Sequence, residues 1–178
     1  MKHEVLVIGR GGQGILLFGR VLGVAAAKYA QLHVSATESY GSETRGTESR
    51  VDMIISDKLE EIDYIKVRKA TIFLVMYPFN LEKYMDMISD NACIFLNATY
   101  IEDFPEKPDW KIHRAPYTEI AEKETGTIRT ANIVALGHVV GKTGIVKPEH
   151  VIDAIREIVP SKWLELNIKA FNVGLNLP

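Results

Sequence analysis

The chain has 178 residues, of which 47% are hydrophobic and 25% are charged, and its formal net charge at pH 7 is -2. This length predicts one domain with a sizeable core, and the composition is that of an ordinary soluble globular protein. The near-neutral charge argues against a nucleic-acid-binding protein, because such proteins neutralise phosphates with an excess of lysine and arginine. The longest apolar stretch, residues 15–27, is too short to span a bilayer, and no targeting segment precedes it. We therefore expect a cytoplasmic protein that binds neither nucleic acid nor membrane.

Strands and helices are predicted to alternate along the chain. Apolar runs rich in Val, Ile and Phe predict strands at residues 4–8, 32–37, 49–56, 70–76, 92–96 and 111–114. Helical spacing of apolar residues predicts helices at 15–30, 81–88, 117–124, 128–142 and 148–159, a last helix with Ser161 as its N-cap, and a short helix or turn within 59–69. This order predicts a single three-layer α/β/α domain over residues 1–178, with a mostly parallel, partly mixed sheet that is Rossmann-like at its N-terminus.

A glycine-rich turn, residues 9–14 (Gly-Arg-Gly-Gly-Gln-Gly), separates the first strand from the first helix. Glycines accept positive φ and expose backbone N–H groups, and a helix N-terminus adds partial positive charge. Such a turn is typical of a phosphate site at the carboxyl edge of a sheet. Gly9, Gly11 and Gly14 fit the dinucleotide pattern G-x-G-x-x-G, and Glu38 follows the second strand where a ribose-binding acid belongs. A tight turn that serves only close helix packing explains the same glycines.

Two features count against a standard dinucleotide fold. Gln13 places a bulky amide at the start of the helix, and the strand at 49–56 follows the second strand without a crossover helix. In the first helix Gly19, Gly23 and Ala27 recur at every fourth position, which allows close approach to a sheet, to another helix or to another chain.

The polar segment 39–47 is the second informative feature. Arg45 is suited to bidentate pairing with a carboxylate or phosphate, and the segment is expected on the same sheet edge as the glycine turn. An exposed turn with solvated charges is the alternative. The candidate ligand-binding residues are Gly9, Gly11, Gly12, Gln13, Gly14, Ser39, Tyr40, Gly41, Glu43, Arg45, Gly46 and Thr47.

No catalytic or metal-ligating residue can be nominated. Cys93 is the only cysteine, which excludes an internal disulfide and an all-cysteine iron–sulfur cluster, and its apolar surroundings favour a buried thiol. The five histidines lack ligand spacing. An anion-type turn without a catalytic constellation favours a binding or assembly role.

Two motifs in order resemble the gamma subunit of 2-oxoacid:ferredoxin oxidoreductases. They are the turn at 9–14 and Ser-Tyr-Gly-x-Glu-x-Arg-Gly at 39–46, whose form is most similar to 2-oxoglutarate-type chains. The resemblance continues through 55–57, 132–137, Asn167, 170–171 and Gly174, and so covers nearly the whole chain. One departure is that Gly46 is followed directly by Thr47, where the family usually has a second glycine.

The resemblance implies a complex that converts a 2-oxoacid, coenzyme A and oxidised ferredoxin into acyl-CoA, CO2 and reduced ferredoxin. It implies alpha, beta and delta-type partner subunits that hold thiamine diphosphate and iron–sulfur clusters, and a gamma chain placed near the entry of coenzyme A. The glycine turn and Arg45 are then expected to meet the coenzyme A phosphates, and this chain itself to be non-catalytic. An isolated chain is expected to form a homodimer if its apolar interface stays exposed.

Two other functions remain open. The first alternative is a stand-alone NAD(P)-binding oxidoreductase built on the glycine turn. The second is a purely structural subunit of a pyruvate, branched-chain or indolepyruvate enzyme.

Overall fold

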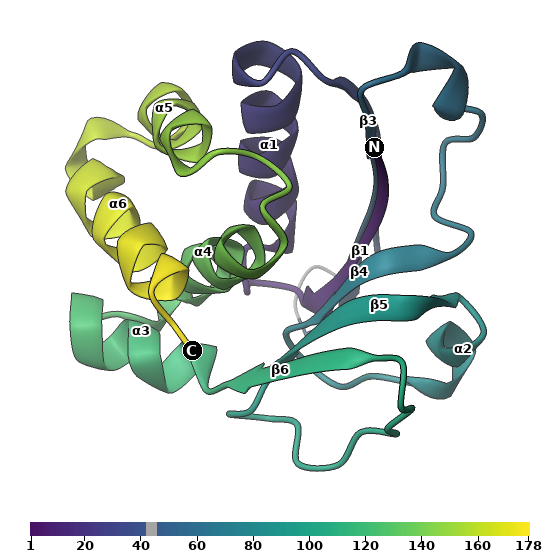
Figure 1. Cartoon of the computed structure of the whole chain (residues 1–178). Coiled ribbons are helices and arrows are strands. Elements are labelled where there is room, and N and C mark those ends of the chain that lie inside the picture. Colours follow the sequence, from purple (N-terminus) through teal and green to yellow (C-terminus); the bar gives the residue numbers. More distant parts are fainter. Residues whose placement is uncertain (42–45) are drawn as a thin grey trace.

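The computed structural model describes residues 1–41 and 46–178, which form one sheet with helices around it (Figure 1). The sheet has the order β2-β3-β1-β4-β5-β6. Its strands are β1 (Lys2–Arg10), β2 (His33–Tyr40), β3 (Glu48–Ser56), β4 (Ala70–Val75), β5 (Ile88–Asn97) and β6 (Lys111–Ala115). β1, β4, β5 and β6 pair in parallel, whereas β3 pairs antiparallel with both β1 and β2. In the described residues the sheet is therefore mixed, and β3 alone runs against the other strands, so the carboxyl ends of those five strands share one edge.

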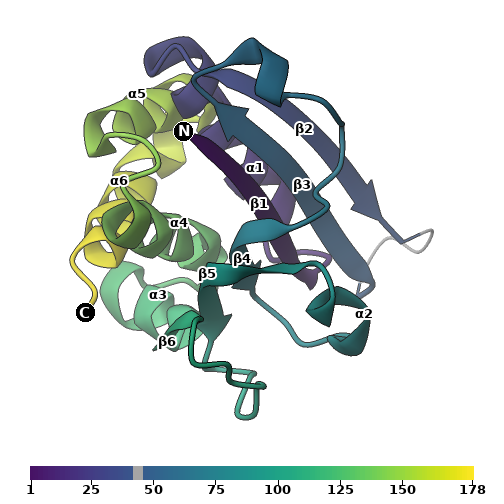
Figure 2. The ribbon, with the colours of Figure 1, turned by 45° about the vertical axis from the view of Figure 1, so that its right-hand side comes forward.

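The helices gather on one face of the sheet (Figures 1 and 2). They are α1 (Ile15–Val24), continued as a π-helix (Ala25–Tyr29), α3 (Tyr117–Thr125), α4 (Ala131–Thr143), α5 (Pro148–Ile158) and α6 (Ser161–Leu175). The short helix α2 (Glu82–Met85) lies beyond β4 and β5, and single 3-10 turns occur at η2 (Leu59–Glu61) and η3 (Ile128–Thr130). No helix in the described part of the chain is both long and apolar enough to cross a membrane.

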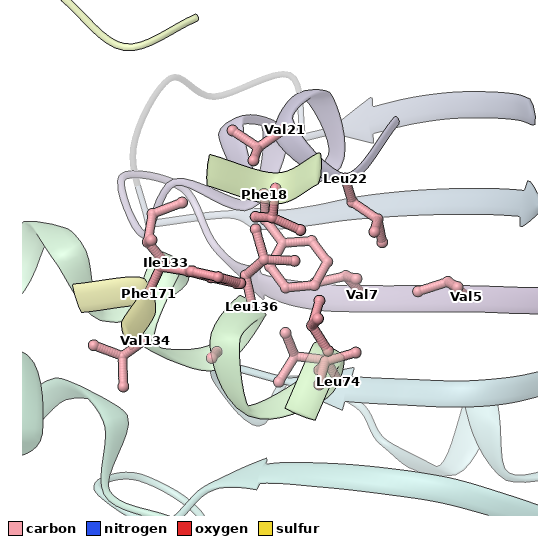
Figure 3. Packing of buried hydrophobic residues seen from close by; sticks show 14 of the residues in the cluster. Val5, Val7, Phe18, Val21, Leu22, Leu74, Ile133, Val134, Leu136 and Phe171 are labelled. Carbon is pink, nitrogen blue, oxygen red and sulfur yellow. The ribbon is translucent and has the colours of Figure 1, made fainter. Parts of the chain in front are cut away.

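The larger core lies between the sheet and helices α1 and α4. Phe18 of α1 and Leu136 of α4 point toward Val7 and Leu74 of the central strands, and all four are buried (Figure 3). Gly19 and Gly23 of α1 face the sheet, since an added Cβ on Gly19 would lie 3.0 Å from Val51 of β3. The small residues of α1 thus allow close packing on this chain's own sheet.

Helices α4 and α6 cross at backbone contact. A Cβ on Gly174 of α6 would lie only 1.9 Å from the carbonyl oxygen of Val134, and one on Gly137 of α4 would lie 2.2 Å from the carbonyl oxygen of Phe171. All residues of α4 from Ala131 to Val140 are buried, because β-sheet, α3 and α6 surround it. α4 is therefore the central helix of the domain.

The second face of the sheet has a thinner cover. A smaller core of Leu6, Ile8 and Phe73 packs against Tyr84 of α2 and Trp110 of the irregular segment before β6. α2 and connecting segments thus form the third layer of the α/β domain. The fold class is confirmed, including the partly mixed sheet.

Several element boundaries differ from the sequence-based expectations. The helix expected at 81–88 is limited to α2, and Ile88 instead pairs with Ala70 at the start of β5. The expected N-cap of the last helix is wrong, because Ser161 is its first helical residue and Pro160 occupies the N-cap position. β2 extends to Tyr40, into the segment expected to be a loop. The absence of a crossover after β2 is confirmed, since β2 and β3 form an antiparallel hairpin.

Candidate functional site

The glycine turn lies at the shared carboxyl edge, directly after β1. Gly12 and Gly14 have φ of 96° and 72°, values that favour glycine. Gly9, still within β1, is required for a different reason: an added Cβ would lie 2.5 Å from the Ile15 side chain. The turn therefore needs glycine both for its backbone angles and for the close approach of α1.

The Gln13 side chain closes this turn. Its Oε1 accepts a hydrogen bond from the Arg10 N–H at 2.8 Å, and its Nε2 donates to the Met76 carbonyl at 3.3 Å. The same Met76 carbonyl accepts from Asn97 Nδ2 at 3.1 Å. The two amides thus tie together the ends of β1, β4 and β5, and the bulk of Gln13 has a structural use in the turn.

Asn132, at the start of α4, holds the other end of the turn. Its Nδ2 donates to the Gly14 carbonyl at 2.9 Å, and its Oδ1 accepts from the Ile133 N–H at 3.0 Å. The side chain is buried and fills the space next to Gly14, where an added Cβ would lie 2.3 Å from Nδ2. The sequence pattern included Asn132, but only the structure gives it this role.

Several N–H groups of the turn are already used within the chain. The N–H groups of Arg10, Gly11 and Gln13 donate to Gln13 Oε1, to the Thr47 carbonyl at 2.7 Å and to the Arg10 carbonyl at 3.0 Å. Those of Gly12 and Gly14 have no hydrogen-bond partner in the described part of the chain. Only part of the turn is therefore available to an anion.

A cavity of about 260 Å³ opens beside the turn. It is lined by residues of the turn, of the β5–β6 connection and of the start of α3 and α4: Arg10, Gly11, Gly12, Gln13, Tyr100, Thr118, Ile128, Arg129 and Ala131. Among the described residues, the lining contains two arginines and no carboxylate. We call it the carboxyl-edge pocket.

The two arginines of the carboxyl-edge pocket form no ion pair with any residue in 1–41 or 46–178. The Arg10 guanidinium lies 4.5 Å from the ring centroid of Tyr77 and 5.8 Å from that of Tyr100, and Arg129 is exposed on η3. Aromatic faces stabilise a cation without neutralising it. Thr118, whose hydroxyl accepts from Asn97 Nδ2 at 3.0 Å, adds a polar group. The pocket is therefore suited to an anionic group.

The described ends of the segment 39–47 lie beside the turn through the Gly11–Thr47 hydrogen bond. Tyr40 is 68% exposed at the end of β2, and Gly46 has φ of 77°. Gly41 has no room for a side chain, since an added Cβ would lie 2.6 Å from Thr47. Ser39 is exposed and pairs with Arg50 in the hairpin register. Glu43 and Arg45 lie outside the described residues.

Sequence reasoning missed Tyr77, Tyr100, Thr118 and Arg129, and did not single out Arg10 within the turn. These residues come from separate loops and share no spacing in the sequence. The sheet alone brings them together, because consecutive parallel strands end at the same edge. A search for arginines and aromatics directly after predicted strands would have found Arg10 and Tyr77.

Two polar clusters lie elsewhere and serve packing. Arg50 donates two hydrogen bonds of 2.6 and 2.7 Å to the buried Asp52. This hydrogen bonding raises the pKa of Arg50. His138 of α4 is buried and shares a hydrogen bond of 2.8 Å with the Tyr117 hydroxyl. Burial lowers the pKa of His138 to about 4.

Cys93 is half-buried on β5, and burial raises its pKa. Among the described residues no three His, Cys, Asp or Glu side chains come together as a metal site.

Comparison with known proteins agrees with this architecture. The family model described as pyruvate ferredoxin/flavodoxin oxidoreductase matches residues 4–177. The 2-oxoglutarate synthase subunit KorC of Methanothermobacter marburgensis is 38% identical over 99% of this chain and 97% of its own length.

Among solved structures, the gamma subunit of a keto/oxoacid ferredoxin oxidoreductase from Geobacter sulfurreducens has a TM-score of 0.82 at 29% identity, over 97% of this chain and 95% of its own. The 2-oxoglutarate:ferredoxin oxidoreductase of Magnetococcus marinus, solved with 2-oxoglutarate, coenzyme A and succinyl-CoA, has a TM-score of 0.83 at 20% identity. That match covers 98% of this chain and 30% of the other, and shows the shared fold alone. The chain belongs to the pyruvate ferredoxin/flavodoxin oxidoreductase family, and its resemblance to the gamma subunits of 2-oxoacid:ferredoxin oxidoreductases is confirmed.

Proposed function

We propose that this chain is the gamma subunit of a 2-oxoglutarate:ferredoxin oxidoreductase and that its carboxyl-edge pocket binds the phosphate groups of coenzyme A. The observation that carries the proposal is a pocket that joins a glycine turn to two arginines, with no acidic side chain among its described lining residues. The choice of 2-oxoglutarate is supported by the name of the relative from Methanothermobacter marburgensis. Coenzyme A is bound in the enzyme from Magnetococcus marinus.

The side chains of the carboxyl-edge pocket suit a phosphate group. Arg10 is held against Tyr77 and Tyr100, so that little side-chain freedom is lost when an anion binds. Gly12 offers a backbone N–H, and Arg129 of η3 offers a fork of donors to the same pocket. A charge-assisted hydrogen bond of this kind contributes about 1.5–3 kcal/mol.

The redox chemistry belongs to other chains of the proposed complex. An iron–sulfur cluster takes four cysteine thiolates in its common form, and this sequence has one cysteine. We therefore assign the clusters and the thiamine diphosphate to the alpha, beta and delta-type partners, which pass electrons to ferredoxin. This chain contributes assembly and the handling of coenzyme A.

The test is steady-state kinetics of the enzyme assembled from this chain and its co-expressed partner subunits. Arg129→Ala and Arg10→Ala should each raise the KM for coenzyme A about tenfold or more, because each removes one phosphate contact. Arg45→Ala, a residue of the sequence prediction, belongs to the same panel. The KM for 2-oxoglutarate should stay unchanged. Arg156→Ala, an exposed arginine on α5 paired with Asp153, is the matched control.

An unchanged KM for coenzyme A in all three variants would refute the phosphate site. Activity with pyruvate or indolepyruvate in place of 2-oxoglutarate would refute the substrate assignment while leaving the phosphate site intact.

The alternative of a stand-alone NAD(P)-binding protein is disfavoured by the sheet order. In a dinucleotide fold β2 lies next to β1, so that its terminal acid reaches the ribose. Here β3 lies between them, which places the strand that carries Glu38 about 10 Å from β1, instead of about 5 Å for an adjacent strand. Glu48 lies opposite Arg10 in the register of β1 and β3, but its carboxylate is bound by Lys83 at 2.7 Å and by the Tyr84 hydroxyl. Tight NADH binding by the isolated chain would revive this alternative.

A further inference from the structure

A second hollow lies on the other side of η3, between α1 and the beginning of α6. It has a volume of about 400 Å³, and Leu17, Arg20, Arg129, Pro160, Trp163 and Asn167 are among its lining residues. We call it the α1–α6 groove. Arg129 lines both this groove and the carboxyl-edge pocket, so the two hollows share one wall.

The α1–α6 groove exposes large apolar side chains. Trp163 is 37% exposed in this groove, whereas the exposed Ile128 of η3 belongs to the lining of the carboxyl-edge pocket. Leu17 and Ile158 line the groove half-buried, over the buried Val159. A tryptophan at the mouth of an apolar hollow is the residue type that most often dominates the binding energy of a protein interface.

The rim of the groove is positively charged. Arg20 and Arg129 are exposed, no ion pair involves either of them in the described part of the chain, and no Asp or Glu lines the groove. This local excess contrasts with the net charge of -2 of the whole chain. The groove therefore favours an occupant that brings an apolar side chain and at least one carboxylate.

Charge also selects among occupants. A second copy docked symmetrically through this groove would bring Arg20 and Arg129 toward the same arginines of its partner, without a carboxylate to separate them. A ligand that offers phosphate alone would leave Trp163 and the apolar floor without a contact, and coenzyme A, which also carries an adenine ring, is separated from a protein partner by the test below. An acidic segment of a different protein satisfies both the rim and the floor.

We propose that the α1–α6 groove is a docking site for another subunit of the same oxidoreductase, which inserts a bulky apolar side chain over Trp163 and places an aspartate or glutamate against Arg20. The inference rests on the proposed role of this chain as a subunit. It goes beyond that role by assigning the surface and the chemistry of the segment that occupies it.

The test measures assembly of the enzyme from this chain, carrying an affinity tag, and its co-expressed partner subunits. Arg20→Glu and Trp163→Ala should each raise the dissociation constant of the complex at least about tenfold, measured by size-exclusion chromatography over a dilution series. The effect of Arg20→Glu should shrink as salt is raised, and that of Trp163→Ala should not. Arg20 is exposed and Trp163 is 37% exposed, so far-UV circular dichroism should show that both variants are folded, and urea unfolding should show that each remains fully folded in the assembly buffer.

Matched controls come from other surfaces. Arg156→Glu reverses an exposed arginine on α5, and Tyr64→Ala removes an aromatic ring that is 48% exposed on the β3–β4 connection. Both variants should assemble like the wild type.

Three outcomes would overturn the proposal. The first is wild-type assembly of both groove variants. The second is loss of self-association of the isolated chain with intact subunit assembly, which assigns the groove to a second copy. The third is a raised KM for coenzyme A in Trp163→Ala with intact assembly, which assigns the groove to the ligand. If the wild-type chain retains no oxidoreductase subunit, the proposed function fails and the docking site fails with it.

Discussion

Replacing Gly14 by alanine imposes two costs of different origin, which a second substitution separates. The residue has φ of 72°, and left-handed backbone costs a non-glycine residue about 1–2 kcal/mol. In addition, the new Cβ would lie 2.3 Å from Nδ2 and 2.9 Å from Cγ of Asn132. Overpacking of a buried position costs about 1–3 kcal/mol. Gly14→Ala should therefore lower the free energy of unfolding by about 2–5 kcal/mol, which combines the two costs.

Asn132→Ala removes both the hydrogen bond to the Gly14 carbonyl and the atoms that collide with the new methyl group. Loss of the bond leaves a carbonyl without that partner and costs about 1–3 kcal/mol. In the double variant the nearest remaining atom is Cβ of residue 132, at 3.5 Å, an ordinary contact. The double variant should lose about 2–5 kcal/mol, less than the sum of the single variants by about 1–3 kcal/mol.

The assay is urea unfolding of the four proteins at pH 7.5, followed by far-UV circular dichroism, with m-values compared to verify two-state unfolding. Gly12→Ala is the matched control: its φ is 96°, but no atom lies within 4 Å of the added Cβ. Because this empty space is established against the described residues, Gly12→Ala should lose only the backbone cost and show no coupling to Asn132→Ala. Additivity of Gly14→Ala and Asn132→Ala within about 0.5 kcal/mol would refute the assignment of Asn132 as the residue that excludes a side chain at Gly14.

Further predictions concern the core and two titrating groups. Gly174→Ala should cost about 3 kcal/mol or more in urea unfolding, because the carbonyl of Val134 at 1.9 Å is backbone and α6 must move away from α4. Burial lowers the pKa of His138 in the folded protein to about 4, against an ordinary value of 6.5. Between these two pH values the unfolded state therefore binds more protons at this residue than the folded state. The contribution of neutral His138 to the free energy of unfolding is complete above pH 6.5, and about 3 kcal/mol of it should be lost as the pH falls from 6.5 to 4. His138→Gln should remove most of this pH dependence. Burial and the Glu48 carboxylate raise the pKa of Tyr84 to about 12, and the pKa values of Tyr117 and Tyr29 are raised as well. Ultraviolet titration of Tyr84→Phe should therefore lose one of the tyrosine ionisations that the wild type shows well above pH 10.

The sequence predicts the sheet well because its central strands are buried on both faces. Residues 70–76 and 92–96 are nearly continuous apolar runs, which is the pattern that parallel strands require. The hairpin of β2 and β3 was also predictable, since 39–47 is too short for a crossover helix. Both predictions depend on signals within one stretch of sequence.

The helix expected at 81–88 shows where local signals fail. Leu81, Tyr84, Met85 and Ile88 have the spacing of an apolar helix face. Ile88 nevertheless starts β5, because pairing with Ala70 satisfies its backbone in the sheet, and the helix stops after Met85. The close crossing of α4 and α6 was equally hidden, since Gly137 and Gly174 meet through the fold and share no local pattern.

In the candidate site, too, neighbouring residues in the sequence predict one part and segments far apart in the sequence supply the other. The glycine turn establishes geometry, a left-handed bend and an open helix start, but geometry alone does not select a ligand. Selection depends on neighbouring charge: an acid adjacent to β1 favours a ribose, whereas arginines favour a phosphate. In this chain β3 separates Glu38 from the turn, Lys83 binds the carboxylate of Glu48, and Arg129 arrives from η3. The insertion of one antiparallel strand therefore changes the chemistry of a turn whose sequence alone also fits a dinucleotide site.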